Sequence, residues 1–197
     1  MSDSAVTRRS KAKSDRRSQL IAAAERLIAE RGYLAVRLDD ICSAVGISGP
    51  AIYRHFSNKE ALLVELLVGI STRLLAGAQR VTASTEDPAE SLNGLVDFHL
   101  DFVFGEPDLI RIQDRDLAHL PDAARRQVRR SQRQYVEIWV AVLTQLNRDL
   151  AEEDARVMAH AVFGLLNSTP YSARPAVPKA HSRALLRRMT LAALTAS

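Results

Sequence analysis

The sequence predicts an all-α fold of nine helices, three in a small N-terminal domain and six in a larger C-terminal domain. Apolar residues recur at helical spacing along most of the 197 residues. Gly, Pro, Asn and Asp residues interrupt these stretches at intervals of one helix length, and no convincing strand or internal repeat is present. A hydrophobic content of 47% is ample for a buried core.

Residues 1–17 are expected to form a basic, disordered arm. They contain six basic and two acidic residues, an excess equal to the net charge of +4 of the whole chain. Such an arm suits contact with phosphates or with a minor groove, and a solubilising tail without ordered contacts is the alternative. The N-terminus has no apolar secretory stretch and no membrane span is expected, so the sequence predicts a cytoplasmic protein.

Residues 18–63 are expected to form a helix-turn-helix domain. Its first helix should cover residues 18–31 and end at Gly32. The second should cover residues 38–45, after which a positive φ at Gly46 turns the chain.

The third helix should begin after Ser48, whose hydroxyl is expected to cap it, and should end near Phe56. Because Ile52 and Phe56 point inward at helical spacing, the remaining residues face outward, where a DNA major groove is the usual partner. These outward residues are Gly49, Pro50, Ala51, Tyr53, Arg54 and His55.

Residues 64–197 are expected to form the larger domain, with a long helix linking it to the first. Asp87-Pro88-Ala89-Glu90 combines an N-cap acid with a proline at the first helical position, which predicts a helix start there. The six expected helices cover residues 59–81, 88–104, 108–117, 122–150, 154–168 and 179–196.

This arrangement resembles the TetR family of ligand-responsive transcriptional repressors. The resemblance rests on the helix-turn-helix, on the run Ile52-Tyr53-Arg54-His55-Phe56-Ser57-Asn58-Lys59-Glu60, and on about six further helices. It is strong over residues 18–63 and weaker beyond. It implies a homodimer that binds a double-stranded DNA operator, with a C-terminal domain for ligand binding and dimerisation.

The resemblance also implies roles for single residues. Tyr53 and Lys59 match positions that hold DNA phosphates, and His55 lies near the backbone. Residues 48–51, Ser48-Gly49-Pro50-Ala51, match the turn that approaches base edges. Because this turn offers few hydrogen bonds to bases, Arg54, Ser48 and DNA shape should contribute more to specificity.

Arg37 departs from the family pattern, which usually has Ser or Thr at the N-cap of the second helix. An arginine side chain cannot accept the exposed backbone N–H bonds of a helix start. Either Asp39 or Asp40 compensates at that helix end, or Arg37 contacts a phosphate, and we favour the phosphate contact because the helix dipole disfavours a cation there.

The last two long helices carry apolar faces that the resemblance assigns to a four-helix bundle between two subunits. Burial of these faces inside one subunit is the alternative. The expected dimer residues are Val162, Phe163, Leu166, Leu185, Met189 and Ala192.

The helices between these two regions are rich in aromatic residues, which are more often core than a ligand site. They also carry polar residues that could point inward, and an apolar cavity with a few polar groups is typical of a small-molecule site. The expected pocket consists of Phe98, His99, Phe102, Gln113, Asp114, Arg115, Tyr135, Trp139 and Asn167. We assign no metal to Asp114, Asp116 and His119, and the sequence indicates no cofactor.

Five arginines lie in the nine residues from Arg125 to Arg133, and a solvated face is their default interpretation. The run Ile112–Asp116, followed by this arginine-rich helix and Trp139, resembles the order of the same features in TetR-type regulators of lipid and acyl-CoA degradation. We therefore expect a small apolar effector such as an acyl-CoA, with a CoA or carboxylate head near Arg115 or the arginine face.

Two other classes of protein are alternatives to a ligand-responsive regulator. A DNA-binding dimer without an effector is the main alternative. An enzyme is remote, because the chain has no phosphate-cradling glycine loop, no GxSxG and no HExxH motif, so no catalytic residue is expected. The residues do not determine whether the regulator represses or activates.

Overall fold

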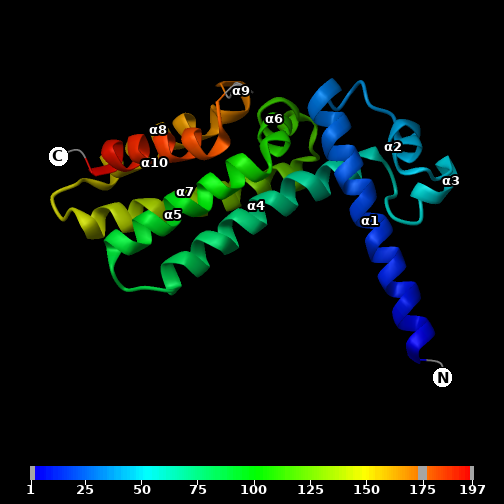
Figure 1. Cartoon of the computed structure of the whole chain (residues 1–197), viewed down its shortest axis with the longest axis horizontal. Helices are drawn as coiled ribbons and strands as arrows, with labels where there is room; N and C mark the ends of the chain where they lie inside the picture. Colours follow the sequence, from blue (N-terminus) through cyan, green and yellow to red (C-terminus); the bar gives the residue numbers. More distant parts are fainter. Residues whose placement is uncertain (1–2, 173–176, 196–197) are drawn as a thin grey trace. The chain divides into compact units, whose positions relative to one another are not determined.

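The computed structural model describes residues 3–172 and 177–195, and all regular structure in these residues is helical (Figure 1). The predicted all-α class is confirmed. In chain order the helices are α1 (Asp3–Arg31), α2 (Leu38–Val45), α3 (Gly49–Ile52), α4 (Lys59–Ala83), α5 (Pro88–Gly105), α6 (Pro107–Asp116), the single 3₁₀ turn η1 (Leu117–His119), α7 (Asp122–Leu146), α8 (Glu152–Asn167), α9 (Thr169–Ser172) and α10 (Lys179–Thr195).

The chain packs as two compact units. Among the described residues, the N-terminal unit comprises residues 3–67 and 111–125, and the C-terminal unit comprises residues 68–110, 126–172 and 177–195. The division expected from the sequence assigned residues 111–125 to the C-terminal domain, whereas the structure groups them with the N-terminal unit. Helices α4, α6 and α7 each continue from one unit into the other.

Residues 3–17 differ from the expected disordered arm, because α1 begins at Asp3 and continues to Arg31 without a break. The segment contains no Gly or Pro, and its Ala, Arg and Lys residues favour a helix. The basic side chains of Lys13, Arg16 and Arg17 therefore recur at helical spacing on α1.

The core of the N-terminal unit is built from the apolar faces of its helices. Cys42 belongs to this core, and burial raises the pKa of its thiol. The buried residues from α1, α2, α3 and the first turns of α4 are Leu20, Ala24, Leu27, Ile28, Ile41, Cys42, Ile52, Leu62, Leu63 and Leu66, joined by Val36 and Phe56 from the connecting segments.

Helix α4 is the one described helix that is long and apolar enough, by length and composition, to cross a membrane. Several of its apolar side chains are buried inside the protein, as in a core helix, among them Leu62, Leu63, Leu66, Leu67 and Ile70. Burial of these side chains in the two units through which α4 passes therefore accounts for its apolar composition.

The core of the C-terminal unit is formed by α5, α7, α8 and α10. Its fully buried side chains include Leu95, Leu100, Trp139 and Leu166. Helix α7 ends at Leu146, four residues earlier than expected, and the short α9 follows α8 where the sequence suggested only a loop.

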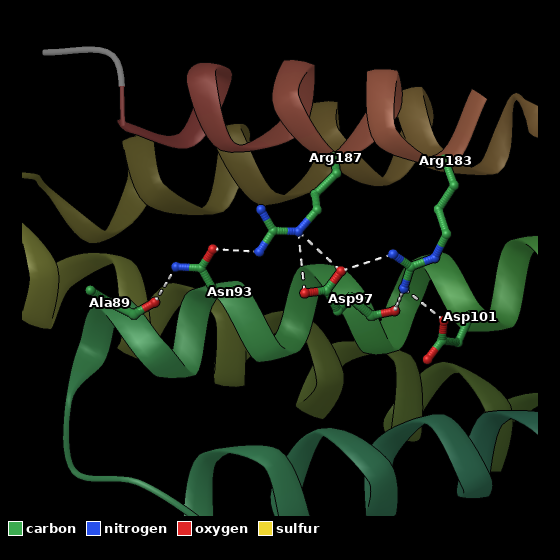
Figure 2. Close-up of polar contacts among 6 residues, drawn as sticks. All are labelled: Ala89, Asn93, Asp97, Asp101, Arg183 and Arg187. Atoms are coloured by element: carbon green, nitrogen blue, oxygen red, sulfur yellow. Dashed lines mark hydrogen bonds and ion pairs between the residues drawn. The ribbon is translucent and has the colours of Figure 1, made fainter. Parts of the chain in front are cut away.

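A polar network joins α5 to α10 within the C-terminal unit (Figure 2). The Arg187 guanidinium donates to Asp97 at 3.1 and 3.2 Å and to Asn93 Oδ1 at 2.8 Å. Arg183 bridges Asp97 at 3.1 Å and Asp101 at 2.7 Å. Because these groups are about one-third exposed or more, their ion pairs add little stability, but they fix how α10 lies along α5.

Candidate functional site

The turn between α2 and α3 has the geometry of a helix-turn-helix. Gly46 adopts φ 69°, and the N–H of Ile47 donates to Cys42 O at 3.0 Å, which closes the end of α2. Regular helix in α3 covers only four residues, but hydrogen-bonded turns continue it, with Phe56 N–H donating to Ile52 O at 2.9 Å. The regular helix therefore ends at Ile52, earlier than expected, and only the hydrogen-bonded turns reach the expected end near Phe56.

Most of the expected outward residues on this segment are accessible. Ser48, Pro50, Tyr53 and Arg54 are exposed, with 61% of Tyr53 accessible. Gly49, Ala51 and His55 are half-buried.

Ser48 stands at the N-cap of α3, but its hydroxyl makes no capping hydrogen bond, so the expected cap is wrong. The N–H of Ala51, in the first turn of α3, donates at 2.9 Å to the backbone carbonyl of Ser48 and not to its hydroxyl. The exposed hydroxyl thus keeps both its donor and its acceptor capacity for an external partner.

Asp40 compensates for Arg37 at the start of α2. Its carboxylate accepts the backbone N–H of Arg37 at 2.8 Å, which is the reach-back half of a capping box. Within the described residues the exposed guanidinium of Arg37 has no hydrogen bond or ion pair. The structure therefore shows the first alternative, compensation by Asp40, and the phosphate contact of Arg37 stays a prediction.

Lys59 is engaged inside the N-terminal unit. Its ammonium donates to the carbonyls of Tyr33 at 2.7 Å and Val36 at 2.8 Å, and lies 4.3 Å from the centre of the Tyr33 ring. An ammonium has three N–H donors, so at most one remains for a phosphate. The main contact of Lys59 in the structure is with the α1–α2 connection.

His55 lies among cations. Burial first, and then Lys13, Arg17, Arg16 and Arg54, lower the pKa of its imidazole. The Nδ1 atom of His55 is buried without a hydrogen-bond partner. This end of the helix-turn-helix therefore has a positive potential, which attracts phosphates over a range of about one Debye length.

Arg115 was expected to line the effector pocket, but the structure uses it in the N-terminal unit. Its guanidinium donates to the carbonyls of Ile28 and Ala29 at the end of α1 and to Asp116 at 3.0 and 3.1 Å. Asp116 is buried and accepts Tyr33 N–H at 3.3 Å. Gln113, Asp114 and Arg115 all belong to the N-terminal unit, so the structure does not group them with the rest of the expected pocket.

The C-terminal unit contains a buried polar network centred on His99. Its Nδ1 lies 2.9 Å from the Tyr135 hydroxyl, and its Nε2 lies 3.1 Å from Asn167 Oδ1. Burial lowers the pKa of His99 from 6.5 to about 4, so the imidazole is neutral at pH 7. Burial also raises the pKa of Tyr135, whose hydroxyl stays protonated and can donate.

Aromatic rings surround this network. We define the ring cluster as His99, Phe102, Tyr135, Trp139 and Phe163, whose neighbouring ring centres lie 5.1 to 6.2 Å apart. Four of its members were expected in the pocket, together with Asn167. Phe163, expected at the dimer interface, is half-buried and packs into this cluster, one turn before Asn167 on the same face of α8.

An open groove of about 430 Å³ lies on α4 and α5 beside the ring cluster. The expected pocket residues Phe98 and Phe102 both line it, with Ile70 and Leu74. Arg73 and Glu106 form an ion pair at 2.5 Å within this lining.

The expected dimer residues separate into two groups. Val162 and Leu166 are buried in the core of the C-terminal unit, so the alternative of burial holds for these two, and Phe163 is half-buried in the ring cluster. Leu185 and Met189 on α10 are 41% and 45% exposed, and Ala192 is exposed. The exposed face of α8 lies about half a turn from the expected one and includes Val157, Ala161 and Gly164.

The arginine face on α7 is solvated. Arg125 pairs with Asp122, whereas Arg126, Arg129, Arg130 and Arg133 are exposed. The last four follow helical spacing on the side of α7 away from the buried Tyr135 and Trp139. A CoA head bound there would not lie beside the ring cluster of the same subunit.

Two family descriptions match the chain. "Bacterial regulatory proteins, tetR family" matches residues 20–66, and "Tetracyclin repressor-like, C-terminal domain" matches residues 85–171. The transcriptional regulator CymR of Pseudomonas putida is 32% identical over 154 residues, which cover 75% of each protein.

The transcriptional activator FasR of Mycolicibacterium smegmatis is 31% identical over 147 residues, which cover 74% of this chain and 63% of FasR. The chain thus spans less than two thirds of the length of that relative. The crystal structure of AibR, solved with isovaleryl coenzyme A and operator DNA, has the same fold, with a TM-score of 0.75 and 19% identity over 88% of this chain and 97% of AibR.

Neutral His99 makes the stability of the C-terminal unit depend on pH. Between pH 6.5 and about 4 the unfolded chain binds a proton at His99 that the folded chain does not bind, so unfolding becomes more favourable as the pH falls. The free energy of unfolding should fall by up to about 1.4 kcal/mol per pH unit from this residue. Denaturant titrations at pH 7, 6 and 5 should show a shallower fall for His99→Gln.

His160→Gln is the matched control, because His160 is exposed on α8. The free energy of unfolding of this variant should fall with pH as steeply as that of the unchanged protein. If the free energy of unfolding fell equally steeply with pH in the unchanged protein and in His99→Gln, folding would not lower the pKa of His99.

Proposed function

The chain belongs to the TetR family of transcriptional regulators and is not an enzyme, and on this premise we propose that it is a homodimeric repressor that a small apolar effector, such as an acyl-CoA, releases from a palindromic operator. The observation that carries the proposal is the exposed helix-turn-helix face, where Tyr53, Arg54 and Arg37 have no partner within the described residues. We further propose that it acts in the cytoplasm, where chromosomal DNA is accessible.

Recognition of DNA in this proposal combines phosphate contacts with a small set of base contacts. Tyr53, Arg37 and Arg54 would bind phosphates or base edges, supported by the cations around His55. Residues 48–51 add apolar contacts and the free hydroxyl of Ser48. Lys59 contributes mainly by holding the connection that leads to Arg37.

Dimerisation would use the exposed faces of α8 and α10, which pack against each other in the C-terminal unit. Exposed apolar or small residues recur on both, with Val157, Ala161 and Gly164 on α8 and Leu185, Met189 and Ala192 on α10. A Cβ placed on Gly164 would meet nothing within 4 Å, so a second helix could approach there closely. The α8–α10 pairs of two subunits would then form a four-helix bundle with two-fold symmetry.

The effector part of the proposal rests on the ring cluster and the adjoining groove. AibR, which shares this fold, was crystallised with isovaleryl coenzyme A. A DNA-binding dimer without an effector is a second candidate, which the close packing of the ring cluster favours. An effector would lower operator affinity by the difference between its binding energies to the two states of the dimer.

Arg37→Ala should weaken operator binding and lower the slope of log K against log salt by about 1, because one phosphate contact is lost. Fluorescence anisotropy of labelled operator at several salt concentrations measures this. Arg31→Ala is the charge-matched control, since Arg31 is exposed at the opposite end of the α1–α2 connection. An unchanged slope for Arg37→Ala would remove Arg37 from the phosphate contacts.

Met189→Glu should convert the dimer to a monomer and lower operator affinity by more than about tenfold, because it buries a charge in the proposed bundle. Sedimentation at micromolar concentration measures the mass. Val177→Glu, at an exposed valine outside α8 and α10, should remain dimeric. A dimeric Met189→Glu protein would place the interface elsewhere.

The experiment that tests the whole proposal is a gel shift with DNA from upstream of the chain's own gene, with and without dodecanoyl-CoA. The acyl-CoA should lower operator affinity by about 5- to 150-fold. Calorimetry on the same protein gives acyl-CoA binding directly. A protein that binds DNA but not acyl-CoA would favour the dimer without this effector.

A further inference from the structure

We propose that residues 13–17 of α1 form part of the DNA interface, and that His55 takes up a proton when a DNA phosphate binds beside them. The inference rests on the proposed DNA-binding role and adds to it a further contact surface and a dependence of operator affinity on pH. The side chains of this phosphate site are Lys13, Arg16, Arg54 and His55.

One face of α1 changes from apolar to cationic towards the N-terminus. Leu20 lies on this face and is fully buried in the core of the N-terminal unit. Lys13, Arg16 and Arg17 precede it on the same face at helical spacing, whereas Asp15 lies on the opposite face. Because α1 continues past α2 and α3 in this direction (Figure 1), cations take the place of core residues where the core ends.

This cationic face lies beside the helix-turn-helix. The Arg16 guanidinium donates to the carbonyl of Val45 at the end of α2, at 3.4 Å, and to Gln19 Oε1 at 2.9 Å. The Arg17 guanidinium lies 4.5 Å from the centre of the Phe56 ring, which closes the turns after α3. The same stretch of α1 therefore flanks both helices of the proposed DNA face.

The three cations of this face differ in how their charge is compensated. Arg17 pairs with Glu65 on α4, with 2.6 Å between Nη2 and Oε2. The hydrogen bonds of Arg16 go only to uncharged oxygens, and the exposed Lys13 has no hydrogen bond or ion pair within the described residues. Two cations beside the helix-turn-helix thus lack a carboxylate partner, and a DNA phosphate fits their charge.

The half-buried ring of His55 lies close to these cations. Its Nδ1 is buried without a partner, whereas Nε2 is the ring nitrogen that is not buried. The acidic groups of the neighbouring elements give little compensation, because Asp15 lies on the opposite face of α1 and Glu65 is paired. The pKa of the imidazole is lowered by burial and then by the charges of Lys13, Arg17, Arg16 and Arg54, so the ring is neutral at pH 7 in the free protein.

A DNA phosphate bound among these cations would reverse the balance of charge at His55. A negative charge close to an imidazole favours its protonated form and raises its pKa. DNA binding would then take up a proton, so the association constant would rise as the pH falls from the pKa of His55 on DNA to its lower pKa in the free protein. Outside this interval His55 has the same charge in both states, and the affinity would not depend on its titration.

Fluorescence anisotropy with labelled DNA from upstream of the chain's own gene, at constant salt, tests this dependence on the full-length protein. The association constant should rise about three- to tenfold from pH 8.0 to pH 6.0, as a rise of about one unit in the pKa of His55 on DNA would give. His55→Gln should remove this rise, and His160→Gln, at an exposed histidine on α8, should keep it. No rise in the unchanged protein, or an equal rise in His55→Gln, would overturn the inference.

Lys13→Ala tests the contribution of α1 separately. It should make the slope of log K against log salt shallower by about 1, because one phosphate contact is lost. It should also raise the pKa of His55 in the free protein, which an NMR titration of the ring protons measures.

Lys11→Ala is the matched control, because Lys11 is exposed on the opposite face of the same helix. It should leave both the salt slope and the pKa of His55 unchanged. A salt slope that Lys13→Ala does not alter would contradict the contact between α1 and DNA.

The same measurements separate this inference from the proposed function. Operator binding of equal strength at both pH values would overturn the inference and leave the DNA-binding role intact. If the protein binds no operator, the NMR titration is repeated with a short duplex of unrelated sequence. A raised pKa of His55 would then support the phosphate site and contradict the proposed function, and an unchanged pKa would contradict both.

Discussion

The connection between α1 and α2 is held by charged side chains from two distant parts of the sequence, and the helix-turn-helix depends on it. Lys59, at the start of α4, donates to the carbonyls of Tyr33 and Val36. Asp116 accepts the N–H of Tyr33, and its neighbour Arg115 donates to the last carbonyls of α1. Because the backbone groups of an irregular segment need partners, these contacts fix the segment that ends at Arg37, where α2 begins.

This constraint explains why residues 111–125 belong to the N-terminal unit. The pairing of Arg115 with Asp116 and with α1 brings the end of α6 and the start of α7 into that unit, while the later part of α7 carries Tyr135 and Trp139 into the core of the other. One helix thus contributes both to the unit that carries the proposed DNA contacts and to the ring cluster. Coupling between the proposed effector site and the DNA-binding unit would require an element with two arrangements, and α7 is one of the helices that contribute to both units.

The features of the fold that could be predicted from the sequence are those that depend on local residue patterns. The turn at Gly46, the inward Ile52 and Phe56 and the helix start at Asp87 follow from spacing and backbone preference, and they are present in the structure. The sequence could not predict which of several chemically suitable partners a long side chain reaches. Arg115 and Lys59 both looked available to anions, yet each is engaged by backbone carbonyls whose position depends on packing. The expected interface residues Val162 and Leu166 are buried for a related reason: two apolar faces of α8 lie about half a turn apart, and only packing shows which of them is buried.

Arg115 and Asp116 tie residues 111–125 to the end of α1 and to the α1–α2 connection. Hydrogen–deuterium exchange on Arg115→Gln tests this most directly, because loss of the guanidinium removes the contacts with Ile28 and Asp116 together. We predict that residues 32–36 and 111–125 lose protection together, while α8 and α10 keep theirs. Unchanged protection in residues 32–36, or an equal loss throughout the chain, would contradict the account.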